Sequence, residues 1–168
     1  MGTAPVITDG DLTLGESGAI VDYVIQTYGK GRLAVKRGEA GFTDYVHWFH
    51  FANGTLQPNA ARVMFLERAD PSGEGALLRA AKERFDLVLS TMEKRLSAAP
   101  YLAGAELTAA DIMSVFSLTT MRLYRPFDLS PYPNILIYLQ RIGARSAYQR
   151  AMQKADPDMT PLLGAKVG

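Results

Sequence analysis

A two-residue hairpin signal near the start of the chain constrains the fold more than any other feature. Asp9-Gly10 stands between Val6-Ile7-Thr8 and Leu12-Thr13-Leu14, two short runs rich in strand-forming residues. A type I′ turn needs positive φ at both central positions, and Asp-Gly is one of the pairs that tolerate it. The sequence therefore predicts an antiparallel hairpin with Asp9 and Gly10 at the centre of its turn.

A helix is predicted directly after the hairpin. Behind Gly15-Glu16-Ser17, apolar residues recur at helical spacing, namely Ala19, Ile20, Tyr23 and Val24. A serine at a helix start can cap free backbone N–H groups. The same N–H groups, together with the helix dipole, can hold an anion such as a carboxylate. The local pattern leaves both interpretations open: an ordinary N-cap, or a small carboxylate-binding corner.

Composition limits the classes of protein that remain. The chain has 168 residues, 48% of them hydrophobic, which is typical of a globular protein with a proper core. Its net charge of +1 gives no electrostatic case for binding nucleic acid or an acidic membrane. It contains no cysteine, which excludes disulfides and cysteine nucleophiles within the chain and fits a cytoplasmic location. There is no apolar run of 18 residues and no secretory signal pattern, so we expect no membrane association.

Helical periodicity dominates the rest of the chain. Gly29 stands where the first helix would need a left-handed cap, and the glycine-rich, basic stretch 30–41 predicts a linker. Pro58 lies inside the long second helix and predicts a bend there. Helices are expected over about 17–28, 42–68, 75–97, 108–123, 133–142 and 146–154.

The clearest capping signal opens the fourth of these helices. Thr108 is expected at the N-cap and Asp111 at the third helical position, with Leu107 and Ile112 placed as a hydrophobic staple. We interpret Asp111 as structural and not as a catalytic base. Several residues of this helix are expected in the core: Ile112, Val115, Phe116, Leu118 and Thr119.

Three expectations concern the C-terminal part of the chain. Ser146-x-x-Gln149 predicts a second capping box. Arg122 and Arg125 are interpreted as a basic helix end favoured by the dipole, although with Tyr124 they could also reach a ligand cleft. The tail after Pro157 is expected to be loosely attached.

In order and spacing, these patterns resemble the glutathione transferases of the bacterial cytosolic type. In that family a loop ending in a cis-proline enters an antiparallel hairpin, and the hairpin feeds a helix that begins Glu-Ser-x-Ala-Ile. Ala4-Pro5, the Asp9-Gly10 turn and Glu16-Ser17-Gly18-Ala19-Ile20 follow in that order here, and Leu107 to Ile112 match the family's fold-specifying cap. The resemblance implies an α+β chain. A partial thioredoxin-like domain (hairpin plus helix) would occupy residues 1–29, a linker 30–41, and an all-α bundle 42–168.

The resemblance also implies a glutathione site. In the family, the residue before the cis-proline pairs its backbone with the cysteinyl part of glutathione, and the Glu-Ser pair binds the γ-glutamyl end. Carried over, these positions are Ala4, Pro5, Glu16 and Ser17. The family usually has a branched aliphatic residue where this chain has Ala4, but the contact uses backbone atoms.

A polar stripe on the long second helix is the candidate pocket for the co-substrate. His50, Asn53 and Gln57 recur at helical spacing, and in the family this part of the helix lines the pocket for the electrophile. The alternative is an ordinary polar stripe at a dimer or domain contact. His47 and His50 lack a third ligand at suitable spacing, so no metal is expected.

The catalytic residue of the family has no counterpart in this sequence. In the family, the thiol-activating Tyr, Ser or Cys belongs to a strand–helix–strand unit that precedes the hairpin. The chain is therefore expected to be N-terminally truncated, as a piece of a longer transferase, a natural module, or a chain completed by another. Two functions stay open: conjugation of glutathione to a small electrophile in detoxification, or a non-catalytic interaction or dimerisation module. The family implies a homodimer that uses the first two helices.

Overall fold

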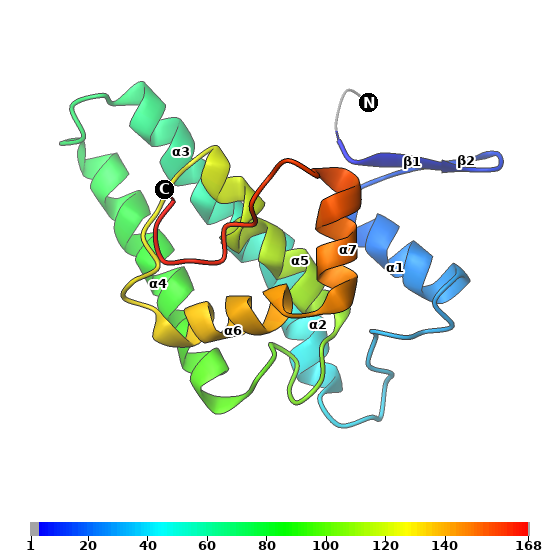
Figure 1. The fold of residues 1–168 in the computed structure, drawn as a ribbon. Coiled ribbons are helices and arrows are strands. Elements are labelled where there is room, and N and C mark those ends of the chain that lie inside the picture. The colour runs from blue at the N-terminus through cyan, green and yellow to red at the C-terminus, as the bar shows by residue number, and fades with distance from the viewer. Residues whose placement is uncertain (1–3, 168) are drawn as a thin grey trace.

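A β-hairpin, one helix and a bundle of further helices make up the fold (Figure 1). The computed structural model describes residues 4–167. The hairpin and α1 stand at one side of the bundle, and a long connection leads from α1 to α2. This arrangement confirms the predicted α+β class. The elements are, in order, β1 (Val6–Asp9), β2 (Leu12–Gly15), α1 (Ser17–Thr27), α2 (Phe42–Phe51), the π-helical turn η1 (Ala52–Leu56), α3 (Gln57–Ala69), α4 (Ala76–Ala98), α5 (Ala109–Leu118), the 3₁₀ turn η2 (Thr120–Leu123), α6 (Pro133–Gly143) and α7 (Ser146–Ala155).

The hairpin forms as predicted, but its turn lies one residue further along the chain. Asp9 pairs with Leu12, so the two central turn residues are Gly10 and Asp11. Of these two, only Gly10 has a positive φ, +58°. This is the pattern of a type II′ turn, which favours glycine at its first central position. The Asp9 carboxylate instead accepts hydrogen bonds from the hydroxyls of Tyr23 (2.8 Å) and Tyr28, which hold the hairpin to α1.

The predicted bend at Pro58 takes the form of a wide π turn. The chain is helical from α2 through α3, but η1 interrupts the α geometry over the five residues before Gln57. The side-chain amide of Asn59 donates to the carbonyl of Thr55 (2.7 Å), a carbonyl within this wide turn. Ala52 and Leu56 are both completely buried, so the turn is fixed from its core side.

The connection between α1 and α2 is anchored to the bundle. The left-handed cap predicted at Gly29 is wrong, because Lys30 (φ 53°) and Gly31 (φ 75°) take the left-handed conformation instead. The carbonyl of Leu33 accepts a hydrogen bond from the backbone N–H of Ala109 (2.8 Å), at the start of α5. Leu33 and its two successors also pack against the core. Residues 30–41 thus contain no described helix or strand, yet they hold α1 close to α5.

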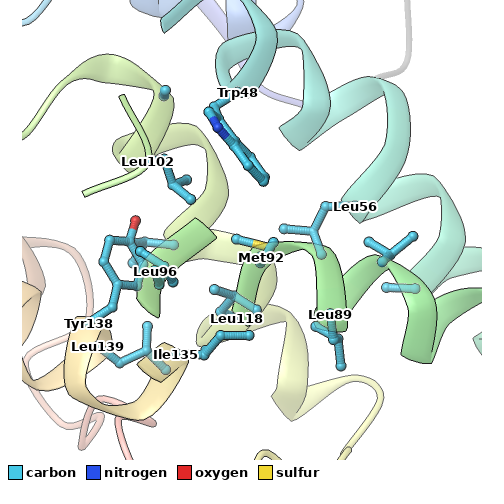
Figure 2. Packing of buried hydrophobic residues seen from close by; sticks show 14 of the residues in the cluster. Trp48, Leu56, Leu89, Met92, Leu96, Leu102, Leu118, Ile135, Tyr138 and Leu139 are labelled. Atoms are coloured by element: carbon cyan, nitrogen blue, oxygen red, sulfur yellow. The ribbon is translucent and has the colours of Figure 1, made fainter. Parts of the chain in front are cut away.

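The main core lies where α2, η1, α4, α5 and α6 meet, and Figure 2 shows part of it. The labelled side chains point toward one another from these helices and from the loop before α5: Trp48, Leu56, Leu89, Met92, Leu96, Leu102, Leu118, Ile135, Tyr138 and Leu139. Two predicted core residues are wrong, since Ile112 and Phe116 are 44% and 45% exposed. The buried face of α5 carries small residues instead, Ala110, Ser114 and Ser117, and small residues let neighbouring helices pack closely.

The predicted capping box at the start of α5 is confirmed. The Asp111 carboxylate accepts hydrogen bonds from the backbone N–H groups of Thr108 (2.8 Å) and Leu102 (2.9 Å). It also accepts from the hydroxyls of Thr108 (3.2 Å) and Tyr138 (3.2 Å). Burial raises the pKa of the Asp111 carboxyl, while these four hydrogen bonds oppose the rise. Asp111 therefore joins the start of α5 to α6 and to the loop before it.

The C-terminal tail is tied down, contrary to the expectation of loose attachment. The Arg122 guanidinium, which is completely buried, donates to the carbonyls of Gly164 (2.8 Å), Ala165 (2.6 Å) and Phe127 (3.1 Å). The carbonyl of Ala165 also accepts from the N–H of Leu129 (2.9 Å). The interpretation of Arg122 as part of a plain basic helix end is therefore wrong. Arg122 is the buried residue that anchors the tail.

The second predicted capping box does not form. α7 begins at Ser146 after Arg145, whose side chain makes no capping bond. The Gln149 amide donates backward to the carbonyl of Gly143 (3.0 Å) in α6, so it links the two helices.

Candidate functional site

The start of α1 has no cap of its own. Ser17 is the first helical residue and not the N-cap, so the interpretation as an ordinary serine cap is wrong. Glu16 precedes it with a left-handed φ of 69°, and its side chain makes no capping hydrogen bond. The first backbone N–H groups of an α-helix have no partner within the helix. They and the helix dipole leave partial positive charge at this end of α1.

A hollow of about 330 Å³ opens beside this helix start. Two acidic residues belong to its wall, Glu16 just before α1 and Asp22 within it, and the long helical segment from α2 into η1 forms the opposite side. The hollow thus combines negative side chains with the positive end of a helix. The complete lining is Glu16, Gly18, Ala19, Asp22, Phe49, His50, Asn53 and Met113.

One hydrogen bond joins the two sides of the hollow. The side-chain amide of Asn53, in η1, donates to the hydroxyl oxygen of Ser17 (2.9 Å). The two residues are 36 positions apart in the sequence and both are half-buried. A Cβ atom at Gly18 would stand 3.8 Å from the Asn53 amide nitrogen and 3.8 Å from the ring of Phe49. α1 therefore lies close against the π turn at this point.

The hairpin register brings the N-terminal end of β1 to the same helix start. Val6 pairs with Gly15, so the start of β1, which Ala4 and Pro5 precede, lies beside the end of β2 that leads into Glu16 and Ser17. The Ala4–Pro5 peptide bond is cis, as the resemblance implies. Ala4 and Pro5 are exposed and do not line the hollow itself.

The structure gathers most, but not all, of the predicted site residues. Glu16, His50 and Asn53 line the hollow. Ser17 is not in the lining, but its hydroxyl accepts the hydrogen bond from Asn53, which is. Gln57, which begins α3, is also outside the lining. Asn53 lies in the widened turn η1, and the rest of this turn separates it from Gln57. Regular α-helical spacing therefore does not hold here, which explains why the predicted stripe included Gln57. Sequence reasoning did not assign five of the lining residues to the site: Gly18, Ala19, Asp22, Phe49 and Met113. Met113 had no signal at all, because it comes from α5, far along the chain.

The other polar constellations of the sequence lie elsewhere. The ring of His47 packs against those of Trp48 (5.0 Å) and Phe51 (5.8 Å) and does not line the hollow. Among residues 4–167 there is no cluster of three metal-ligating side chains. Arg125 is buried over the ring of Phe85 (4.9 Å) and pairs with Glu67 (3.3 Å), so it too is remote from the hollow. Over the same range, no helix is both long and apolar enough to cross a bilayer.

The charge arrangement suits a small zwitterion. A ligand carboxylate can accept from the N–H groups at the start of α1 and from the Ser17 hydroxyl. A ligand ammonium can pair with the carboxylates of Glu16 or Asp22, which face the same hollow. The neighbouring Phe49 and Met113 offer apolar surface to the rest of such a ligand.

Comparison with known proteins identifies the same lineage from several sides. Residues 56–146 match the model of the glutathione S-transferase C-terminal domain. Glutathione S-transferase 3 of Zea mays is 28% identical over 157 residues, which cover 90% of this chain and 71% of that protein. Glutathione S-transferase 1 of Manduca sexta is 29% identical over 166 residues, covering 98% and 75% respectively.

Solved structures agree with these sequence relatives. A glutathione S-transferase of Actinobacillus pleuropneumoniae superposes with a TM-score of 0.79 at 28% identity, over 92% of this chain and 70% of that one. The bacterial transferase BphK, solved as a ternary complex, gives 0.75 at 28% identity, over 91% and 74%. The matching domain model alone spans more than half of the 168 residues. The chain therefore belongs to the glutathione S-transferase family.

Proposed function

We propose that this protein binds glutathione at the hollow beside α1 and takes part in conjugating its thiol to a small electrophile. The observation that carries the proposal is the uncapped start of α1, with the Ser17 hydroxyl held at its edge by Asn53. The γ-glutamyl end of glutathione bears one carboxylate and one ammonium. Both charges find complementary groups at this helix start.

The proposed roles divide the tripeptide among three parts of the site. Ser17 and the first N–H groups of α1 hold the γ-glutamyl carboxylate, and Glu16 accepts its ammonium. The backbone of Ala4, fixed by Pro5, pairs with the cysteinyl part. His50, on the wall contributed by α2, faces the electrophile. Conjugation then needs the thiolate of glutathione, since the thiolate is the nucleophile, and none of the residues named here is assigned to its activation.

The proposed domain division follows from the same roles. Residues 1–29 would form the glutathione-binding unit of thioredoxin-like lineage, residues 30–41 a linker, and residues 42–168 the all-α domain. A detoxifying enzyme of this kind would act in the cytoplasm without a metal.

A glutathione-binding assay tests the proposal. The intact chain is applied to immobilised glutathione, and its dissociation constant for free glutathione is measured by calorimetry. We expect retention and elution by free glutathione. Ser97→Ala is the matched control for Ser17→Ala, because the exposed hydroxyl of Ser97 bonds only to the carbonyl of Lys94, near the C-terminal end of α4. Ser97→Ala should bind like the wild type, and a folded wild-type chain that does not bind glutathione contradicts the proposal.

We propose, as a second candidate function, a module that dimerises with a second copy of itself. An apolar groove of about 760 Å³ runs between α3 and α4, and its rim carries Phe65 and Leu77, which are 61% and 77% exposed. The same face thus holds both a hollow and projecting apolar side chains, as the self-complementary surface of a two-fold dimer requires. This keeps the C-terminal half of the second predicted helix, which is α3, in the proposed contact and replaces the first predicted helix by α4.

Light scattering after size exclusion tests the dimer separately from glutathione binding. The wild type should elute as a dimer and Phe65→Glu as a folded monomer. Ile137 is a suitable control, because it is also exposed (56%) but lies on α6, outside the groove. A wild-type monomer, or a Phe65→Glu dimer as stable as the wild type, would refute the proposed interface.

A further inference from the structure

We infer that Asn53 is a positioning residue for glutathione recognition, acting through the hydroxyl of Ser17, and not part of the pocket for the electrophile. This inference rests on the proposed binding of glutathione. It reassigns Asn53 from the stripe that it shares with His50 and Gln57 in the sequence.

The direction of the Asn53–Ser17 hydrogen bond gives Asn53 a defined role. A serine hydroxyl has one hydrogen to donate and two lone pairs to accept with. Because the Asn53 amide donates to the Ser17 oxygen (2.9 Å), one lone pair is occupied and the hydroxyl hydrogen remains available. A carboxylate has no hydrogen of its own and can only accept. Asn53 therefore keeps Ser17 in the state in which it donates to a bound carboxylate.

The π turn is the device that brings Asn53 to this position. Ala52 and Leu56 flank it within η1 and are both completely buried, so the turn cannot rotate without disturbing the core. At Gly18, α1 lies so close to η1 that an added Cβ would be in van der Waals contact with the Asn53 amide nitrogen, at 3.8 Å. π turns inside longer helices are frequent at functional sites. Here the turn sets the side chain of a distant helix against the first residue of α1.

Replacing the donor by an acceptor separates this role from simple packing. Asn53→Ala removes the bond to Ser17, and we expect the dissociation constant for glutathione to rise about fivefold, the effect of one ordinary hydrogen bond. Asn53→Asp has nearly the same shape, but its carboxylate accepts the hydroxyl hydrogen of Ser17 and adds a like charge beside the bound carboxylate. We expect it to weaken binding at least tenfold more than Asn53→Ala.

A double-mutant cycle provides a measurement that a structural role would not affect. If Asn53 acts through Ser17, Ser17→Ala combined with Asn53→Ala should bind glutathione within about twofold of Ser17→Ala alone. Independent roles would make the two losses multiply. Asn134→Ala is the matched control, since it removes another amide that donates to a side chain, that of Glu93 (2.6 Å), away from the hollow. It should leave the dissociation constant unchanged.

Calorimetric titration of these variants with glutathione, with circular dichroism to confirm folding, tests whether Asn53 acts through Ser17. The inference is wrong if folded Asn53→Asp binds as well as Asn53→Ala, or if the losses from Asn53 and Ser17 multiply. A contact test without glutathione adds to this: the side-chain amide resonance of Asn53 should shift in Ser17→Ala. If the wild type binds no glutathione while that resonance does shift, the contact stands, but the proposed function and the recognition role both fall.

Discussion

α5 and α1 begin in opposite ways, although each has an acidic residue close to its start. At α5, the Asp111 carboxylate accepts from the N–H groups of Thr108 and Leu102, and the carbonyl of Leu33 takes the N–H of Ala109. At α1, the side chain of Glu16 makes no cap. At α5 these donors find acceptors within the protein, and Asp111 is completely buried, whereas the start of α1 opens on a hollow.

The difference separates stability from recognition within one chain. A buried helix end must pair its donors, because an unpaired buried N–H costs about 1–3 kcal/mol. A helix end beside a hollow can leave its donors to water until a ligand carboxylate replaces the water. The start of α5 therefore holds the bundle together, whereas we propose that the start of α1 binds a ligand.

The largest expected effect is the loss of stability when the cap of α5 is removed. Asp111→Ala deprives two backbone N–H groups and the Tyr138 hydroxyl of their acceptor inside the core. We expect the free energy of unfolding to fall by about 3–5 kcal/mol, measured by urea denaturation. The corresponding change at α1, Glu16→Ala, should cost less than about 0.5 kcal/mol. Equal losses at the two helix starts would remove the contrast between them.

A somewhat smaller effect is expected at the buried anchor of the tail. Arg122→Met removes the donor to the carbonyls of Gly164 and Phe127 and one of the two donors to that of Ala165, although it also removes a buried charge. We expect a loss of about 2 kcal/mol and faster proteolytic cleavage after Pro157. Arg145→Met changes an exposed arginine and serves as the control. A tail as resistant to protease in Arg122→Met as in the wild type would mean that Arg122 does not anchor it.

The smallest effect concerns the attachment of the hairpin to α1, and it depends on pH. Hydrogen bonds from Tyr28 and Tyr23 lower the pKa of Asp9, and the bond to Asp9 raises the pKa of Tyr28 to about 12. The raised pKa of Tyr28 stabilises the attachment fully below pH 10 and ceases to do so as the pH rises through about 12. The lowered pKa of Asp9 stabilises it above pH 3.8, and this contribution is lost as the pH falls through the folded pKa.

Tyrosinate absorbance follows this attachment directly. In the wild type Tyr28 should titrate near pH 12, and the difference between the curves of the wild type and Tyr28→Phe should isolate that step. Asp9→Asn removes the negative charge and should move the step back toward pH 10. A titration curve that Asp9→Asn leaves unchanged would show that Tyr28 does not depend on Asp9.

The sequence predicted those parts of the fold whose signals are local. The hairpin, the Thr108–Asp111 cap and the helix positions depend on turn chemistry and periodicity, which a few neighbouring residues carry. The inward face of α5 was predicted only in part: Val115 and Leu118 are buried as expected, but two more large apolar residues were expected beside them. The close packing of this helix instead buries alanine and serine, and Ile112 and Phe116 remain exposed.

The candidate site was predictable only in part, for a related reason. Glu16 and Ser17 stand in a local motif, whereas the contact between Ser17 and Asn53 joins residues 36 positions apart. The π turn that creates this contact has no signal of its own beyond Asn53-Gly54 and Pro58. Arg122 was misjudged similarly, because two of its three partners lie more than 40 residues away in the tail.

The most direct test of the contrast between the two helix starts is the glutathione affinity of Ser17→Ala, measured by calorimetry beside its unfolding free energy. The hydroxyl of Ser17 should donate to a charged carboxylate, a bond typically worth about 1.5–3 kcal/mol. We predict a dissociation constant at least tenfold higher than that of the wild type, with stability unchanged to within about 0.5 kcal/mol. Unchanged affinity in a folded Ser17→Ala variant would contradict the assignment of the α1 start as the binding end of the molecule.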